Sequence, residues 1–255
     1  MKITRIIVIL LLLMLPIVIY VTNIDKKIYY LALGDSLAIG QNPYGKIGYG
    51  YSDYVGDYLK NKKVLEFYTK KYAVSGYRTT DLIRDINDNK KIIVDNQEIT
   101  IKNALTNADI VTLSIGANDL FYKLGLTNAN VFLENPEQVK PYIDEVLIDI
   151  EKLIILIKLY CKEDIIMVGY YNPLWQMNIS HAEKTESLFL YANNKMKLLA
   201  DKYNVYYVDI YELFKENNDF LPNPLDIHPS NSGYKAISDQ IITIIEENIL
   251  NWLVK

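Results

Sequence analysis

Residues 28–37 have the sequence IYYLALGDSL, a run of strand-forming side chains that ends at a glycine and continues into an aspartate and a serine. Aromatic and large aliphatic residues favour a buried strand, and Gly34 allows a tight turn directly after it. The segment Tyr49–Lys60 then places apolar side chains at helical spacing. This stretch therefore predicts a first strand, turn and helix, with Ser36 in the turn.

The same order of strand, loop and helix recurs farther along the chain. Residues 64–74 can hold a second strand, and Thr79 or Thr80 can cap a helix that continues through Ile86. Residues 91–101 have the sequence KIIVDNQEITI, in which an Asp-Asn pair separates two strand-forming arms. This pattern predicts a hairpin outside the main sheet.

The rest of the chain continues the alternation. Three further apolar runs have the length of strands, namely Asp109–Ile115, Asp164–Tyr170 and Val205–Ile210. Long helical patterns separate and follow them, over Pro136–Tyr160, His181–Tyr203 and Ser230–Leu250, and Ser180 with Glu183 forms a capping box for the second. Strands that alternate with helices predict a three-layer α/β/α sandwich around a parallel sheet of about five strands.

Composition excludes several classes of protein. The 255 residues are half apolar and carry a net charge of -4, as expected for one globular domain with a large core. The sequence lacks the basic runs that bind nucleic acid. The single cysteine, Cys161, allows no internal disulfide and no paired-cysteine metal site, so we expect a buried, unreactive thiol.

The amino terminus has the pattern of a membrane-targeting segment. Lys2 and Arg5 precede an apolar run from Ile6 to Val21, and charged residues follow it. No small-residue cleavage pattern is present, which favours an uncleaved signal anchor over a cleaved signal peptide. We therefore expect residues 1–24 to anchor the chain in the cell membrane and residues 25–255 to form an extracytoplasmic domain, which would be secreted if the segment were cleaved.

Polar residues and glycines gather where the predicted strands end, the edge at which parallel sheets bind ligands. The sequence Gly-Asp-Ser-Leu occupies residues 34–37, Ser75-Gly76 follows the second strand, and Gly-Ala-Asn-Asp occupies residues 116–119. Asp-Ile-His-Pro occupies residues 226–229 near the end of the chain. In this order and combination, the four motifs resemble those of the SGNH hydrolases, also called GDSL esterases and lipases, whose fold is flavodoxin-like.

The resemblance implies a role for each motif residue. It implies that Ser36 is the nucleophile, that His228 is the base, and that an acid lies close before this histidine. It also implies an oxyanion hole that combines the N–H groups of Ser36 and Gly76 with the Asn118 side chain. The family usually has its acid three residues before the histidine, where this chain has Leu225. We expect Asp226 to take that role; the alternative is a Ser36–His228 pair oriented by a backbone carbonyl.

The chemistry of these residue types supports the same assignment. A serine hydroxyl becomes a good nucleophile when a neighbouring base takes its proton, and neutral imidazole suits that task near neutral pH. Of the two histidines, His181 falls in the first turn of a predicted helix, whereas His228 lies in a loop beside an aspartate and a proline. We therefore expect His228 to be the base. Asp35 and Asp119 stand where carboxylates stabilise helix starts or loops, so we assign them structural roles.

These features predict a serine esterase or lipase that hydrolyses carboxylic esters through an acyl-enzyme, without metal or cofactor and without an obligate protein partner. An extracytoplasmic polysaccharide O-acetylesterase of the same mechanism and a non-catalytic surface binding protein are the alternatives. The residues after the fourth strand could receive an acyl chain or could simply pack against a helix. They are Tyr170, Tyr171, Pro173, Leu174, Trp175 and Met177, and Phe121 and Tyr122 have the same two possible roles.

Overall fold

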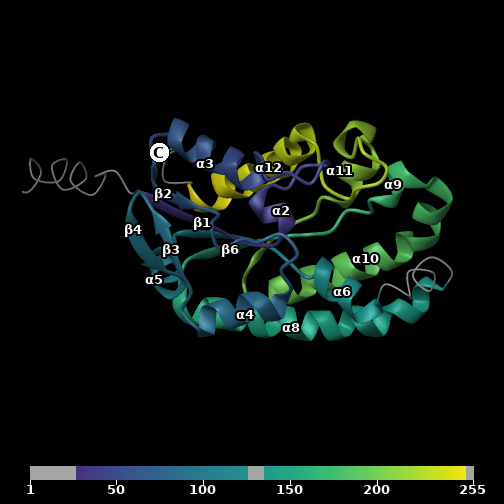
Figure 1. Ribbon diagram of the computed structural model, residues 1–255, viewed down its shortest axis with the longest axis horizontal. Coiled ribbons are helices and arrows are strands. Elements are labelled where there is room, and N and C mark those ends of the chain that lie inside the picture. Colours follow the sequence, from purple (N-terminus) through teal and green to yellow (C-terminus); the bar gives the residue numbers. More distant parts are fainter. Residues whose placement is uncertain (1–26, 126–134, 251–255) are drawn as a thin grey trace, which may run out of the picture.

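The computed structural model describes residues 27–125 and 135–250 (Figure 1). The predicted membrane anchor, residues 1–24, lies outside these ranges. Among the described residues, no helix combines the length and the apolar character needed to cross a membrane.

The centre of the domain is a parallel sheet of five strands, as the alternating pattern predicts. The strands lie in the order β2-β1-β5-β6-β7. Their bounds are β1 Ile28–Gly34, β2 Leu65–Thr69, β5 Ile110–Ser114, β6 Asp164–Val168 and β7 Tyr206–Val208. Strand β2 lies beside β1 in one direction along the sheet, and the chain then returns to place β5 on the opposite side of β1. This reversal between β1 and β5 opens a crevice at their carboxyl ends, where such folds bind ligands.

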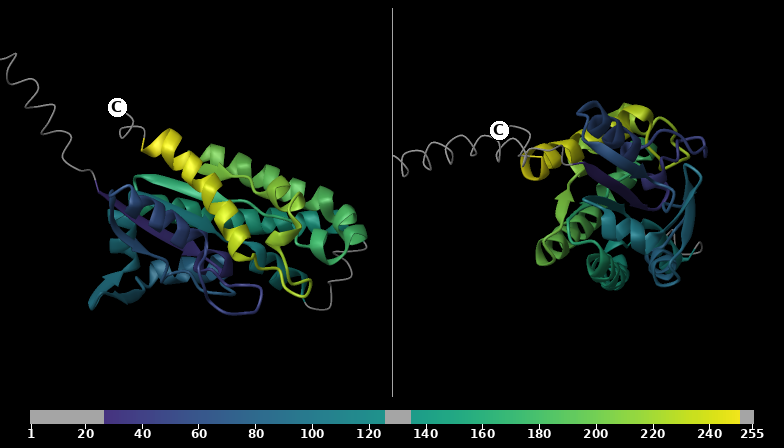
Figure 2. Two further views of the ribbon diagram at one scale, coloured as in Figure 1. Left: turned by 90° about the horizontal axis from the view of Figure 1, so that it is seen from above. Right: turned by 90° about the vertical axis from the view of Figure 1, so that its left-hand side faces the viewer.

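Helices cover both faces of this sheet, which confirms the three-layer prediction (Figure 2). On one face lie α3 (Tyr51–Asn61) and α12 (Asn231–Ile244), which a single π-helical turn extends over Ile245–Ile249. On the other face lie α4 (Thr79–Asn87), α5 (Ile101–Asn107), α8 (Lys140–Tyr160) and α10 (Ile179–Lys202).

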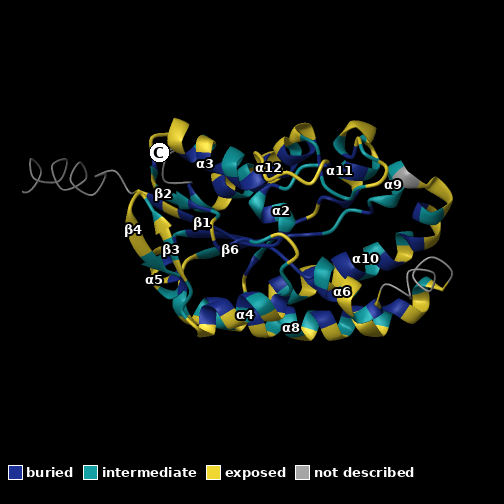
Figure 3. Cartoon of the chain, viewed as in Figure 1, coloured by how far each residue is buried: buried dark blue, intermediate teal, exposed yellow. Residues whose placement is uncertain are grey.

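The first strand shows why both faces need cover. Tyr30 and Ala32 contribute to the core on the α3 and α12 face, whereas Leu31 and Leu33 contribute to the core on the α8 and α10 face. All four side chains are buried, because neighbouring side chains of a strand point to opposite faces. Figure 3 shows this buried layer of strands between helices whose outer faces are exposed.

The predicted hairpin is also present. β3 (Lys91–Val94) pairs antiparallel with β4 (Gln97–Thr100), apart from the main sheet. Asp95 and Asn96 have φ values of 49° and 63°, the left-handed conformation that a two-residue hairpin turn requires. Short aspartate and asparagine side chains tolerate this conformation better than most others.

Two predicted helix caps are wrong. Helix α10 begins at Ile179, and Asn178 caps it by accepting a hydrogen bond from the His181 N–H at 3.1 Å, so Ser180 lies inside the first turn. Asparagine and serine are equally good caps, and the chain takes the extended conformation of a cap at Asn178, where the short helix α9 (Leu174–Met177) ends. At α4 the cap position is Arg78 rather than a threonine.

Candidate active site

Ser36 lies at the carboxyl end of β1. Ser36 is the first residue of the short helix α2 (Ser36–Ile39), and Asp35 caps this helix by accepting a hydrogen bond from the Leu37 N–H at 3.0 Å. Gly34 has a φ of 133°, and a Cβ there would lie 1.9 Å from the Ser114 carbonyl oxygen of β5. Only glycine fits this position, so close packing of β1 against β5 fixes the turn that carries Ser36.

His228 and Asp226 form a compact pair in the loop before α12. Asp226 Oδ1 accepts hydrogen bonds from the His228 backbone N–H at 2.8 Å and lies 2.7 Å from His228 Nδ1. The two-residue spacing therefore allows the carboxylate to reach the ring by folding back on its own loop. Leu225, at the family's usual acid position, is 91% exposed. Ser230 caps the following helix, as predicted, by accepting from the Gly233 N–H.

The other ring nitrogen of His228 is buried and has no hydrogen-bond partner among the described residues. Ser36 and His228 line the same cavity, which has a volume of about 230 Å³. The structure thus brings together a serine and a histidine that are far apart in the sequence. In unliganded sites the bond between such groups is often long and tightens only when substrate binds.

A residue that the sequence analysis did not single out also reaches the imidazole. Gln41 Nε2 lies 3.3 Å from His228 Nδ1, and its Oε1 accepts a hydrogen bond from the Ser75 hydroxyl. The Tyr234 hydroxyl donates to the Gln41 carbonyl oxygen at 2.6 Å and holds the backbone. No local pattern marks Gln41, because its partner His228 is 187 residues away.

Gly76 lies in a turn beside the serine loop, and the side chain of Asn118 reaches this turn from helix α6 (Ala117–Leu124). Gly76 has a φ of 83°, and a hydrogen bond from the Tyr77 N–H to the Val74 carbonyl oxygen closes its turn. The Val74 N–H donates to the Gly34 carbonyl oxygen, which ties the turn to the end of β1. Asn118 Nδ2 donates to the Tyr77 carbonyl oxygen at 3.0 Å. Within the described parts of the chain, nothing accepts a hydrogen bond from the Gly76 N–H. Gly76 and Asn118 are therefore held together, with the glycine donor free.

Asp119 stabilises the start of a neighbouring helix, α4. It belongs to α6, but its carboxylate accepts from the Thr79 N–H at 2.9 Å and from the Thr79 hydroxyl at 3.0 Å. It thus satisfies a free backbone donor at the start of α4, which supports the structural role predicted for it. Thr79, one of the two predicted caps of α4, is instead the residue whose N–H is capped.

Asp35 is a buried carboxyl group beside the serine. Burial raises the pKa of Asp35 to about 7, although hydrogen bonds from the Leu37 N–H and the Ser114 hydroxyl oppose the shift. The pKa of an unfolded aspartate is about 3.9. The contribution of Asp35 to stability is therefore fully present below about pH 4 and is lost as the pH rises through about 7.

The loss of stability with rising pH predicts the behaviour of Asp35→Asn. Asparagine keeps the capping oxygen but cannot ionise. At pH 8 the variant should be more stable than the unchanged protein by up to about 4 kcal/mol, and the difference should vanish near pH 4. Urea unfolding at pH 4, 6 and 8 measures the difference. A stability difference that stays constant over this range would contradict the buried, ionising carboxyl group.

The remaining candidates lie away from this cluster. His181 is half-buried in the first turn of α10 and does not line the cavity. Cys161 is a buried free thiol whose pKa is raised by burial, as predicted. In residues 27–125 and 135–250, no group of three or more histidine, cysteine, aspartate or glutamate side chains could hold a metal ion.

The aromatic residues near the cavity divide into two groups. Tyr170, Tyr171, Pro173, Leu174 and Phe121 line the cavity. Tyr122 instead lies against Arg78, whose guanidinium carbon is 4.1 Å from the ring centroid, and Trp175 lies beside Lys215 outside the cavity. The Met177 side chain is outside the described part of the structure.

Comparison with known proteins identifies the family of the chain. Residues 32–236 match the GDSL-like Lipase/Acylhydrolase family. The uncharacterized protein YpmR of Bacillus subtilis strain 168 is 29% identical over 234 residues, which cover 89% of this chain and 84% of that protein.

Solved structures of two hydrolases share the fold. The lipase Lip_vut3 from a goat rumen metagenome has a TM-score of 0.65 at 20% identity, over 84% of this chain and 95% of that one. The acetylxylan esterase Axe2 of Geobacillus stearothermophilus has a TM-score of 0.60 at 20% identity, over 87% and 96%. Since the family match spans most of the chain, the protein is an ester hydrolase and belongs to the GDSL-like Lipase/Acylhydrolase family.

Proposed function

We propose that the protein hydrolyses carboxylic esters through an acyl-enzyme formed on Ser36, with His228 as the base and Asp226 as the acid. One observation carries this proposal. Asp226 holds one ring nitrogen of His228 at 2.7 Å. The other ring nitrogen is buried and has no hydrogen-bond partner within residues 27–125 and 135–250, and His228 lines the same cavity as Ser36. A proton on Nδ1, donated to Asp226, leaves Nε2 as the free base.

The reaction then takes two steps, acylation and deacylation of Ser36. In the first, Ser36 Oγ attacks the ester carbonyl carbon while His228 Nε2 takes the hydroxyl proton; the alcohol leaves as the C–O bond breaks and receives that proton. In the second, water attacks the acyl-enzyme, His228 again takes and returns one proton, and the acid is released. Asp226 keeps the imidazole in the required tautomer and stabilises its protonated form during both steps.

Three donors are available for the negative charge that develops on the carbonyl oxygen. The Ser36 N–H is at the start of a helix, where backbone donors have no partner inside the helix. The Gly76 N–H has no acceptor in the part of the chain that the structure describes, and Asn118 donates one of its two amide hydrogens to Tyr77. We propose that these groups form the oxyanion hole, in which donors fixed before the reaction stabilise the transition state.

Covalent labelling tests the proposal. The full-length protein is treated with a fluorophosphonate probe, and the modified residue is mapped by mass spectrometry. We expect modification at Ser36 that is lost in His228→Ala but retained in His181→Ala, the matched control. A well-folded protein that is not labelled would favour a non-catalytic binding protein instead. A polysaccharide O-acetylesterase would be labelled equally, so the two hydrolases must be separated by their acyl group.

A further inference from the structure

The cavity beside Ser36 is polar at one end only. Polar side chains on its wall are confined to the serine end, where they comprise Asp35, Ser36, Ser114 and His228. The two tyrosines of the wall have used their hydroxyls on the backbone: Tyr170 donates to Ile115 at 2.8 Å and Tyr171 to Ile227 at 2.5 Å. The rest of the wall is therefore carbon, contributed mainly by helices α6, α8 and α10.

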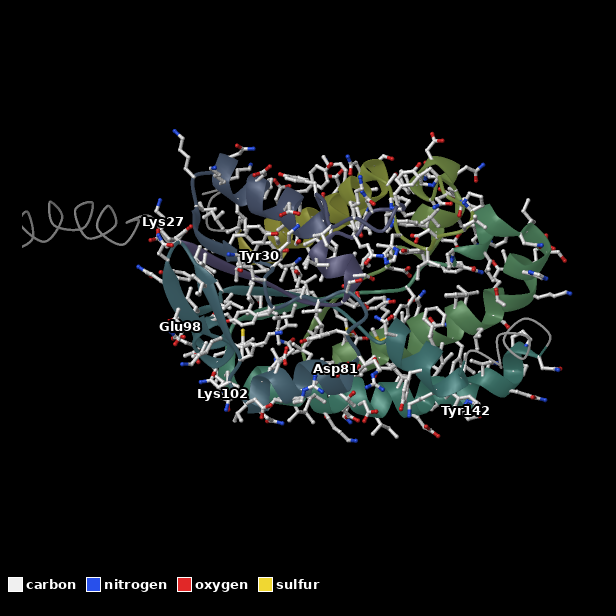
Figure 4. All side chains as sticks on the ribbon, viewed as in Figure 1. Lys27, Tyr30, Asp81, Glu98, Lys102 and Tyr142 are labelled. Carbon is white, nitrogen blue, oxygen red and sulfur yellow. The ribbon has the colours of Figure 1, made fainter. Side chains whose placement is uncertain are left out.

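The lengths of the secondary-structure elements explain why this space exists. Helices α8 and α10 have 21 and 24 residues, about 31 and 36 Å, whereas β5 and β6 have five residues each, about 17 Å. Both helices lead back to strands, so their amino-terminal ends project beyond the carboxyl edge of the sheet. Tyr142, in the first turn of α8, lies far from Lys27, the residue directly before β1 (Figure 4). The projecting ends enclose a space that no strand fills.

The wall determines which part of a substrate fits. A sugar ring needs hydrogen-bond partners for its hydroxyls, and burying them against carbon is costly. An acetyl group would occupy only the serine end. A volume of about 230 Å³ is far more than an acetyl group needs, because one water-sized group takes only ~30 Å³ of a liquid. A flexible hydrocarbon chain of several carbons suits both the volume and the chemistry of the wall.

We infer that this cavity binds the acyl chain of the ester, and that the preferred substrates are esters of medium-chain fatty acids rather than of acetate. This inference rests on the proposed ester hydrolysis at Ser36. The carbonyl group lies at the polar end beside Ser36 and His228, and the alkyl chain extends between α8 and α10. Each methylene that leaves water for this wall favours binding by about fourfold.

Ala192 controls the space available to the chain. It lies on α10, is 8% exposed, and packs with Ile143 and Leu188 in the apolar cluster at the projecting helix ends. Ala192→Phe would fill the cavity there. Leu198→Phe is the matched control, because it adds an aromatic ring to the same helix at a position that is 65% exposed and does not line the cavity.

Kinetics with p-nitrophenyl acetate and octanoate test the inference, since the alcohol is constant. We expect kcat/KM of the unchanged protein to be at least about 100-fold higher for octanoate than for acetate. Ala192→Phe should lower this ratio by about 30-fold or more, and Leu198→Phe should leave it within about twofold. Free octanoate should also inhibit acetate hydrolysis competitively in the unchanged protein, a measurement that needs no variant to fold.

Binding separates this inference from the proposed catalysis. Calorimetry of octanoate with the Ser36→Ala protein should show one site, and Ala192→Phe in that background should abolish it. Octanoate binding without turnover of any ester would refute the catalysis and keep the cavity assignment. Turnover that is equal for both esters, or that is highest for acetate, would overturn the acyl-chain assignment and favour the O-acetylesterase.

Discussion

Replacing Ser36 with alanine is expected to lower kcat/KM for a p-nitrophenyl ester by about 10⁴-fold or more, because the nucleophile of the acyl-enzyme is lost. The same change should alter the free energy of unfolding by less than about 0.5 kcal/mol. The reason is local: the Ser36 hydroxyl makes no hydrogen bond among the described residues, and Asp35 rather than Ser36 caps the helix. Initial rates and urea unfolding of the same preparation measure both quantities.

Ser52→Ala provides a contrasting control. The Ser52 hydroxyl is buried and donates to the Ala38 carbonyl oxygen at 2.9 Å. Its loss leaves a buried acceptor without a partner and should cost about 1–3 kcal/mol, with ester turnover retained. A structural serine thus affects stability and a catalytic serine affects turnover. If Ser36→Ala behaved like Ser52→Ala, Ser36 would be a structural residue.

Removal of the Asp226 carboxylate should have the next largest effect. Asp226→Ala is expected to lower kcat by about 10³–10⁴-fold, because the imidazole loses the group that fixes its tautomer and stabilises its positive charge. Asp226→Asn is more informative, since the carboxylate oxygen that contacts Nδ1 also accepts from the His228 N–H. An amide oxygen can keep both bonds and lacks only the charge, so we expect a smaller loss, about 10²-fold. Steady-state kinetics of both variants measure these losses.

The double variant Leu225→Asp with Asp226→Ala tests the position of the acid. It moves the carboxylate to the family's usual position, three residues before His228. Leu225 is 91% exposed, so its replacement should remain in solvent and should not restore activity. Recovery of more than about tenfold over Asp226→Ala alone would show that the loop can present an acid from either position and that its observed geometry is not decisive.

Much of the fold can be predicted from the sequence because its signals are local. Strand β1 and its turn are set by apolar side chains followed by Gly34, and the hairpin turn by residues that accept a positive φ. Helix starts are less certain, as Asn178 and Ser180 show. Both are good caps, and the choice depends on where the preceding helix α9 ends, which is a matter of packing rather than of capping preference.

The sequence alone thus determined the layers, the parallel sheet and the four motifs at the strand ends, since strand and helix periodicity and glycine turns depend on neighbouring residues. Only the tertiary structure decided three things: that the Asp226 carboxylate folds back onto His228, that Gln41 reaches the same ring, and that an apolar cavity opens beside Ser36. The cavity is the space left where long helices outreach short strands. Such a space depends on how distant segments pack, and no local pattern in the chain encodes it.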